Sequence, residues 1–280
     1  MSHFKVFVIG DNISAQLQPF HEFECTGIDD EYVIDVDNTE KMQEEWRGAQ
    51  EDFHQVSFDQ YLLGDDWTIF ANRAVVIKTG QSKYRYAFKD PEGETRTFRR
   101  TNPNSKWDSW VIGGRFNEAL LLKSGIRSNQ ALRGKIDFEK IFQQHHASAR
   151  EMWENVRDVV PIDLWNPVSS FGRSYREYWE QRALVILKDD PALCKTMMFM
   201  NAFEIDSFLR SKEEHADATA YGWTTPYAFV RDGKWSAKGE MGWWGVSKDG
   251  DNVEAWEKAA YEMLLSLADD TLITVVDCHI

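Results

Sequence analysis

The C-terminal stretch 227–280 constrains the fold most strongly, because several structural signals follow one another there. Asp232-Gly233 lies between two apolar segments, which is the pattern of a tight β-hairpin turn. Asp251 and Glu254 have capping-box spacing and open an amphipathic helix pattern. The chain then ends in a β-branched run at 272–280. A terminal strand stays ordered only when other elements hold it, so we expect the C-terminus to belong to the core.

Strand patterns also mark the N-terminus and the middle of the chain. A β-branched and aromatic run ends at Gly10-Asp-Asn12, which predicts the first strand and its turn. The segments 84–88 and 95–98 flank Asp90-Pro-Glu-Gly93 and predict a hairpin, because Pro presets φ and Gly permits positive φ. We expect further strands at 74–78 and at 107–112, the second ending in a sharp bend at Gly113-Gly114.

Helix patterns occupy 39–53 and most of the stretch 137–222. In the second stretch we expect helices at 138–160, 175–188 and 192–210, interrupted by Pro161 and Pro167. The sequence therefore predicts a single α+β domain over 1–280. Its one mixed or antiparallel sheet contains both the N- and C-terminal strands, and 137–222 forms a helical insert or subdomain.

The charge is distributed unevenly along the chain. The net charge of −14 divides into −13 for 1–72, +9 for 73–135 and −10 for 136–280. An acidic total argues against a general nucleic-acid binder, which needs a basic face. The basic middle is either a polyanion site or a partner for the acidic flanks within one fold.

Other totals define the class of protein. Three cysteines do not form a disulfide framework, so we expect a reducing cytoplasm. No apolar run approaches the roughly eighteen residues of a membrane helix, and we expect no membrane partner.

Four motifs of this sequence are long enough to be specific. They are His3-Phe-Lys-Val-Phe-Val-Ile-Gly10, Asn102-Pro-Asn-Ser-Lys-Trp-Asp108 with Ile112-Gly-Gly-Arg115, Gly239-Glu-Met-Gly-Trp-Trp-Gly245 and Asp270-Thr-Leu-Ile-Thr-Val-Val-Asp-Cys-His-Ile280. They resemble the motifs of an uncharacterised family of bacteriophage and prophage proteins. The resemblance implies a phage-encoded accessory protein in the cytoplasm of a bacterial host. It implies no catalytic residues.

The two glycine- and tryptophan-rich motifs supply the candidate ligand site. Trp offers a stacking face, a glycine pair lets a ligand approach the backbone, and Arg binds phosphate or carboxylate with two hydrogen bonds. The alternative is a bent core strand with packed Trp and an Arg–Asp pair. The candidate residues are Lys106, Trp107, Asp108, Trp110, Gly113, Gly114, Arg115, Met241, Trp243 and Trp244, with Arg99 and Arg100 as neighbouring cations.

Two sets of residues have the composition of a metal site, although no cofactor is predicted. His21, Cys25, Cys278 and His279 match a structural zinc site in composition, but adjacent strand residues point to opposite faces. Asp35 and Asp37 alternate on one strand face and could hold Mg²⁺ through oxygen ligands. The alternatives are packing of the cysteines and solvated acidic turns.

No nucleophile, dinucleotide or metalloprotease motif occurs in the sequence, which lowers the expectation of an enzyme. The leading hypothesis is an accessory protein that binds a host or phage macromolecule, most plainly a protein, and inhibits bacterial anti-phage defence. The alternative is an enzyme or sensor for a nucleotide or phosphate ligand at the Trp, Arg and Gly residues. The sequence leaves open whether the chain forms a homo-oligomer.

Overall fold

The computed structural model describes residues 3–52, 56–75, 84–172, 175–197, 200–241, 247–249 and 252–280. Contacts between Cα atoms divide the chain into two compact units. Unit 1 contains Ser14–Trp110 and Cys278–Ile280, and unit 2 contains His3–Ile13 and Val111–Asp277. Two compact units can belong to one domain or to two, so the single domain over 1–280 stays a prediction.

The main sheet has six strands in the order β11-β10-β1-β14-β6, with β9 also paired to β14. β1 pairs with β10 in parallel, whereas β10 pairs with β11, and β14 with β9, in antiparallel fashion. The bounds are β1 (His3–Ile9), β6 (Ser109–Ile112), β9 (Gln130–Leu132), β10 (Ala228–Arg231), β11 (Lys234–Ala237) and β14 (Leu272–His279). Both terminal strands lie in this mixed sheet, which confirms the predicted α+β class.

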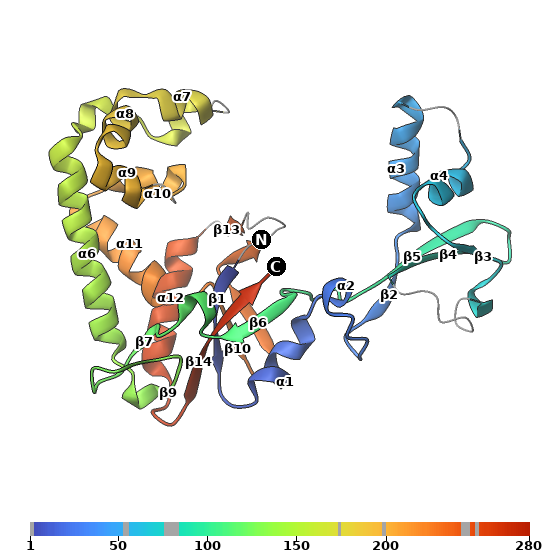
Figure 1. The fold of residues 1–280 in the computed structure, drawn as a ribbon, viewed down its shortest axis with the longest axis horizontal. Helices are drawn as coiled ribbons and strands as arrows, with labels where there is room; N and C mark the ends of the chain where they lie inside the picture. Colours follow the sequence, from blue (N-terminus) through green and yellow to red (C-terminus); the bar gives the residue numbers. More distant parts are fainter. Residues whose placement is uncertain are drawn as a thin grey trace. The chain divides into compact units, whose positions relative to one another are not determined.

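One face of the main sheet packs against α6 (Phe138–Val159) and α12 (Val253–Ser266), with α11 (Lys212–Thr224) alongside (Figure 1). Alternation places Phe7 and Ile9 of β1 on the same face. They share a buried core with Ile273 of β14, Ile141 of α6 and Leu264 of α12. This core therefore buries the first half of β14.

Within the predicted helical stretch 137–222, the helices between Val156 and Phe208 surround a second buried core. The further helices of this stretch are α7 (Tyr175–Glu180), α8 (Arg182–Asp189), α9 (Pro191–Met197) and α10 (Ala202–Asp206), with 3-10 turns at Ile162–Leu164, Val168–Phe171 and Ser207–Leu209. The side chain of Asp206 accepts hydrogen bonds from the Trp165 indole (3.1 Å) and the Tyr178 hydroxyl (2.9 Å).

Unit 1 contains a second sheet of four strands in the order β2-β5-β4-β3. β5 pairs with both β2 and β4 in antiparallel fashion, and β3 pairs with β4 in parallel. The bounds are β2 (Ile34–Asp37), β3 (Ile69–Phe70), β4 (Arg85–Lys89) and β5 (Thr95–Thr101). The helices of unit 1 are α1 (Ile13–Leu17, with Ile13 in unit 2), α2 (Phe23–Thr26), α3 (Thr39–Asp52) and α4 (Phe58–Gly64).

The sequence predicted one sheet, whereas the described residues form the main sheet, the sheet of unit 1 and two small hairpins. The hairpins pair β7 (Leu120–Leu121) with β8 (Arg127–Ser128) and β12 (Gly239–Met241) with β13 (Ser247–Asp249). The second sheet arises because β5 uses both of its edges within unit 1. The basic hairpin therefore does not extend the main sheet.

Several predicted boundaries are wrong for identifiable reasons. The helix over 175–188 breaks at Gln181, whose side chain accepts from the Asn166 N–H (2.8 Å) and donates to its carbonyl (3.1 Å). The helix over 192–210 divides because Asn201 caps a new helix in a capping box with Glu204. Asn252 is the N-cap of α12, and Asp251 lies outside the described residues. Of the strand predicted at 74–78, the described part is helical and the rest lies outside the described residues.

Candidate functional site

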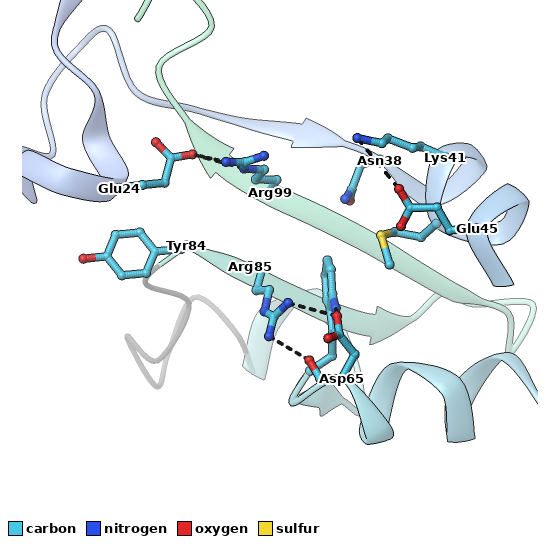
Figure 2. A pocket seen from close by; sticks show the side chains of 10 residues that line it. Glu24, Asn38, Lys41, Glu45, Asp65, Tyr84, Arg85 and Arg99 are labelled. Carbon is cyan, nitrogen blue, oxygen red and sulfur yellow. Dashed lines mark hydrogen bonds and ion pairs between the residues drawn. The ribbon is translucent and has the colours of Figure 1, made fainter. Parts of the chain in front are cut away.

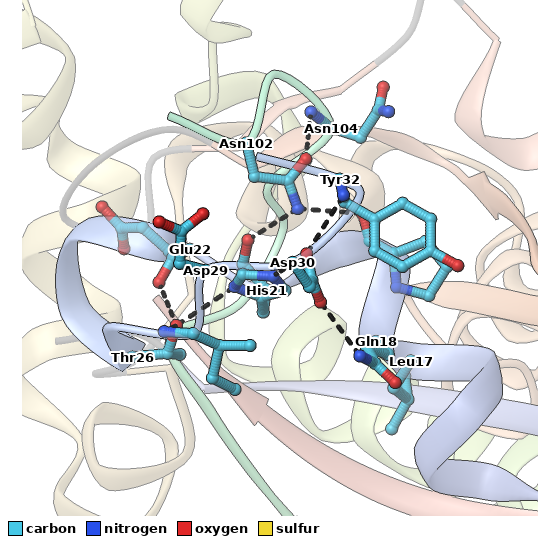
Figure 3. A network of polar contacts seen from close by, with 12 residues as sticks. Leu17, Gln18, His21, Glu22, Thr26, Asp29, Asp30, Tyr32, Asn102 and Asn104 are labelled. Atoms are coloured by element: carbon cyan, nitrogen blue, oxygen red, sulfur yellow. Dashed lines mark hydrogen bonds and ion pairs between the residues drawn. The ribbon is translucent and has the colours of Figure 1, made fainter. Parts of the chain in front are cut away.

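The first candidate motif, 102–108, forms hydrogen bonds with the segment 17–21 of unit 1 (Figure 3). The buried Asn102 amide donates to the carbonyls of Pro19 (3.0 Å) and His21 (2.8 Å). The Lys106 N–H donates to the Phe20 carbonyl (2.7 Å). Trp107 is also buried, and its indole N–H donates to the Leu17 carbonyl (3.0 Å). The Trp107 ring is therefore part of the core of unit 1 and does not offer an open stacking face, while a ligand site at this motif stays a prediction.

The glycine pair makes room for protein side chains. Gly113 and Gly114 have φ values of 75° and 52°. A Cβ atom on Gly114 would lie 2.4 Å from Oδ2 of Asp277, and one on Gly113 would lie 2.4 Å from Nδ2 of Asn129. Buried Asp277 accepts the Arg115 N–H (2.8 Å) through the same Oδ2 oxygen. The close approach predicted from the glycines is present, but Asp277 and Asn129 occupy the space.

The remaining ligand candidates do not form a described pocket. Trp110 is half-buried in β6, and the side chain of Arg115 is exposed. Met241 ends β12, whereas Trp243 and Trp244 lie outside the described residues. A ligand site at these residues stays a prediction.

His21 of the zinc hypothesis is a buried structural residue (Figure 3). Its Nδ1 lies 3.1 Å from Thr26 Oγ1 and its Nε2 lies 3.2 Å from Asp30 Oδ1. Burial alone would raise the pKa of Asp30, but hydrogen bonds from Gln18, the Tyr32 N–H and His21 hold this pKa below its ordinary value. Both ring nitrogens are occupied by protein partners, so the arrangement favours a structural role over metal binding.

Cys25, Cys278 and His279 do not form one metal-binding group. Cys278 is fully buried, and Nδ1 of His279 lies 2.6 Å from Asp108 Oδ1. In the part of the chain that the structure describes, the only group with metal-ligand spacing is Glu22, Cys25 and Asp108, whose ligand atoms lie within 4.8 Å of one another. Cys25, Cys194 and Cys278 are not joined by disulfide bonds.

The thiol in this group is poorly prepared to act as a ligand. Cys25 is exposed as a residue, yet partial burial of its sulfur and the neighbouring charges of Glu22 and Asp108 raise its pKa to about 11. A protonated thiol is a weak ligand and a weak nucleophile. The zinc hypothesis gains no support from this geometry.

Asp35 and Asp37 hold guanidinium groups instead of an open cation site. Asp35 Oδ1 lies 3.2 Å from Arg100, and Asp37 accepts a short hydrogen bond from Arg96. These carboxylates thus neutralise basic residues of the same sheet, a role that differs both from the Mg²⁺ hypothesis and from its alternative of solvated acidic turns.

The basic hairpin as a whole pairs with the acidic first part of the chain. Five basic residues of β4 and β5 form ion pairs with carboxylates from 24–65. The pairs are Arg85–Asp65, Lys89–Asp59, Arg96–Asp37, Arg99–Glu24 and Arg100 with Asp29 and Asp35. Pairing within one fold therefore explains much of the charge asymmetry, as the second of the two alternatives states.

A pocket of about 380 Å³ opens beside β4, β5 and the N-terminal part of α3 (Figure 2). Its lining residues all belong to unit 1. They are Glu24, Asn38, Lys41, Met42, Glu45, Asp65, Trp67, Tyr84, Arg85 and Arg99. Sequence reasoning named Arg99 alone among them. Tyr84 and Arg85 lie in the strand predicted at 84–88, and no site signal in the sequence marks the other lining residues.

The pocket combines an apolar base with a rim of ion pairs (Figure 2). Met42 and Trp67 are buried, and the Arg85 guanidinium lies 5.3 Å from the centroid of the Trp67 ring. Arg85 donates to the side chain (3.0 Å) and the carbonyl (2.7 Å) of Asp65. Arg99 pairs with Glu24 at 2.9 Å, and Lys41 with Glu45 at 3.9 Å.

One polar atom of a residue that lines the pocket has no hydrogen bond within the described part of the chain. It is Oδ1 of Asn38, the residue between β2 and α3. A buried amide oxygen without a partner carries a desolvation cost of about 1–3 kcal/mol. Because this oxygen is buried, a ligand donor would reach it only after the Asn38 side chain turns toward the pocket.

The chain matches no family model, no curated protein and no solved structure. No helix among the described residues has the length and apolar character needed to cross a membrane.

Proposed function

We propose that this chain is a binding protein that engages a protein partner through the pocket of unit 1. The observation that carries this proposal is the ion-paired rim around Met42 and Trp67. Interface hot spots combine a desolvated aromatic base with polar groups that fix orientation, and they accept amphipathic side chains such as Arg, Tyr or Trp. The motif resemblance supports a more specific role, a phage-encoded accessory protein that acts in the host cytoplasm against bacterial defence.

The charges of the pocket favour a protein side chain over a nucleotide. Each of its three cations, Lys41, Arg85 and Arg99, already pairs with a carboxylate. A phosphate would have to displace those carboxylates or bind beside their negative charge. Seven of the ten lining residues are charged or carry an amide, whereas small-molecule pockets are mostly apolar.

A matched pair of variants tests the proposal. Arg99 and Arg96 both lie on β5 and both pair with a carboxylate, but their odd spacing puts them on opposite faces of the sheet. Only Arg99 lines the pocket. With the partner recovered from phage-infected cells and purified, we expect Arg99→Ala to weaken binding about tenfold, the scale of one interface hot spot. We expect Arg96→Ala to change it by less than about twofold.

The same protein samples decide between a protein and a small ligand. A nucleotide or inorganic phosphate that binds the folded chain raises its apparent melting temperature by mass action. We expect no such rise with ATP, GTP or phosphate. A rise that Arg99→Ala abolishes, without a recoverable protein partner, would replace the proposal by the alternative of a phosphate-ligand sensor.

A further inference from the structure

We infer that the outer edge of β2 accepts an additional β-strand from a basic, extended segment of the protein partner. This inference rests on the proposed function and names the partner's chemistry and its mode of binding. In strand addition, main-chain hydrogen bonds supply affinity, and alternate side chains supply specificity.

The edge of β2 is accessible. β2 is the end strand of the unit 1 sheet, and within the described ranges no strand pairs with its outer side. All four of its residues are exposed, including Ile34 (48%) and Val36 (36%). Two exposed β-branched residues on an open edge are a template for another strand.

The register identifies the backbone groups that a partner strand would use. The Asn38 N–H donates to the Thr97 carbonyl (3.1 Å), next to the paired residues Asp37 and Phe98. In an antiparallel ladder, alternate residues direct their backbone groups to opposite sides. The N–H and C=O groups of Asp35 and Asp37 therefore face away from β5, toward the open edge.

The charge around this edge selects a basic segment. From Asp29 to Glu45 the chain carries eight acidic residues and one lysine. Glu31, Glu40 and Glu44 are exposed and form no ion pair with any described residue. A second copy of the same edge would bring like charges together, which is destabilising across a strand pair. A strand rich in Lys or Arg gains attraction at the same place.

Side chains of the edge strand β2 lie on the same face of the sheet as the pocket. Val36 is directly opposite Arg99 in the register, so the two side chains share one face. Arg99 lines the pocket, and Asn38 connects the end of β2 to it. An added strand would therefore place every second side chain on the face that carries Val36 and Arg99.

The experiment uses the full chain and two synthetic strand peptides of about eight residues. Both alternate Val and Thr with a charged residue, which is Lys in the first peptide and Glu in the second. We expect fluorescence anisotropy to show binding of the Lys peptide and at least about tenfold weaker binding of the Glu peptide. Hydrogen exchange should show new protection at the amides of Asp35 and Asp37 when the Lys peptide binds.

Variants at one position separate the backbone from the charge. Asp35→Pro removes an outward N–H and keeps the pairing with β5, since Pro is tolerated on the open side of an edge strand. Asp35→Asn removes the same charge but keeps the N–H. We expect Asp35→Pro to weaken Lys-peptide binding about tenfold and Asp35→Asn less than about threefold. If Asp35→Pro does not fold, the pair Asp37→Pro and Asp37→Asn, at the other outward N–H, replaces it with the same expectation.

Equal binding of the two peptides, no binding of either, or unchanged binding by the edge variants overturns strand addition. These outcomes do not decide the proposed function. Its own test is whether Arg99→Ala weakens the binding of a purified protein partner. Failure to recover any partner, combined with Lys-peptide binding at β2, would instead overturn the pocket proposal and retain the edge as the binding surface.

Discussion

Different interactions stabilise the interior of each of the two units. Unit 2 has two extensive apolar cores, one between the main sheet and its helices and one inside the helical stretch. The described clusters of unit 1, around Met42 and Trp67 and around Tyr86 and Phe88, are small. There, ion pairs join the acidic first part of the chain to β4 and β5.

This difference indicates a division of roles. A closely packed core transmits strain and holds one arrangement. Exposed ion pairs contribute little stability, and a charged partner can exchange with them at low cost. We therefore expect unit 2 to act as the scaffold and unit 1 to carry the adaptable binding surface. Three measurements can break or sharpen this comparison.

The largest effect should follow from a cavity in unit 2. Leu264 of α12 is fully buried in the core against the main sheet. We expect Leu264→Ala to lower the free energy of unfolding by about 4 kcal/mol, from lost transfer energy and an unfilled cavity. Hydrogen exchange in urea would report this loss for the amides of unit 2, and added salt should not change it. A loss below about 1 kcal/mol would contradict the assignment of unit 2 as the rigid scaffold.

Acid should also destabilise unit 2, through a buried histidine. His215 of α11 is 3% exposed, and its Nδ1 lies 2.9 Å from Ser207 Oγ. Burial lowers the pKa of His215 to about 4, and nearby Arg210 acts in the same direction. Above pH 6.5 the ring is neutral in both states and its stabilising contribution is complete. As the pH falls from 6.5 to about 4, the unfolded chain binds a proton that the folded chain does not, so stability is lost.

The expected loss from His215 is about 3 kcal/mol across this range, at about 1.4 kcal/mol per pKa unit. The measurement is urea unfolding at several pH values for the wild-type chain and for His215→Gln, whose amide can still reach Ser207. The variant should lose less stability on acidification. Parallel pH profiles for the two proteins would show that the acid sensitivity of unit 2 has another source.

The sequence revealed the fold wherever local chemistry decides it. Asp232-Gly233 and Asp90-Pro-Glu-Gly93 each specify a turn, and both hairpins occur as predicted. The breaks at Gln181 and Asn201 were missed because they depend on side-chain hydrogen bonds that periodicity does not contain.

The candidate site was harder to predict because its residues come from separate segments. Gly113-Gly114 and Trp107 have the composition of a ligand site, but Asp277 and Leu17, far away in the sequence, use those groups for the fold. The pocket in turn combines Asn38, Trp67 and Arg99, and the pairings of β2 with β5, of β5 with β4 and of β4 with β3 bring their segments together. Local patterns contain no information on the pairing of β2 with β5.

The smallest effect should come from unit 1 and should depend on salt. Arg100 is the most highly paired cation of β5, with Asp29 at 2.6 Å and Asp35 at 3.2 Å. Because Asp29 is half exposed, we expect Arg100→Ala to cost unit 1 only about 1 kcal/mol at low ionic strength. Raising the salt to about 1 M should reduce the difference from wild type to near zero, since the Debye length falls to about 3 Å.

Arg47→Ala is the matched control, because the Arg47 guanidinium contacts only the Gln43 side chain, at 3.5 Å, among the described residues. Hydrogen exchange at the amides of unit 1 is the measurement for both variants, and Arg47→Ala should leave it unchanged at both salt concentrations. A loss from Arg100→Ala as large as that from Leu264→Ala, and equally insensitive to salt, would mean that unit 1 depends on this arginine as a rigid core does. The contrast between an apolar scaffold and an electrostatic binding unit would then fail, and with it the reason to expect a charged partner to be accommodated at β2.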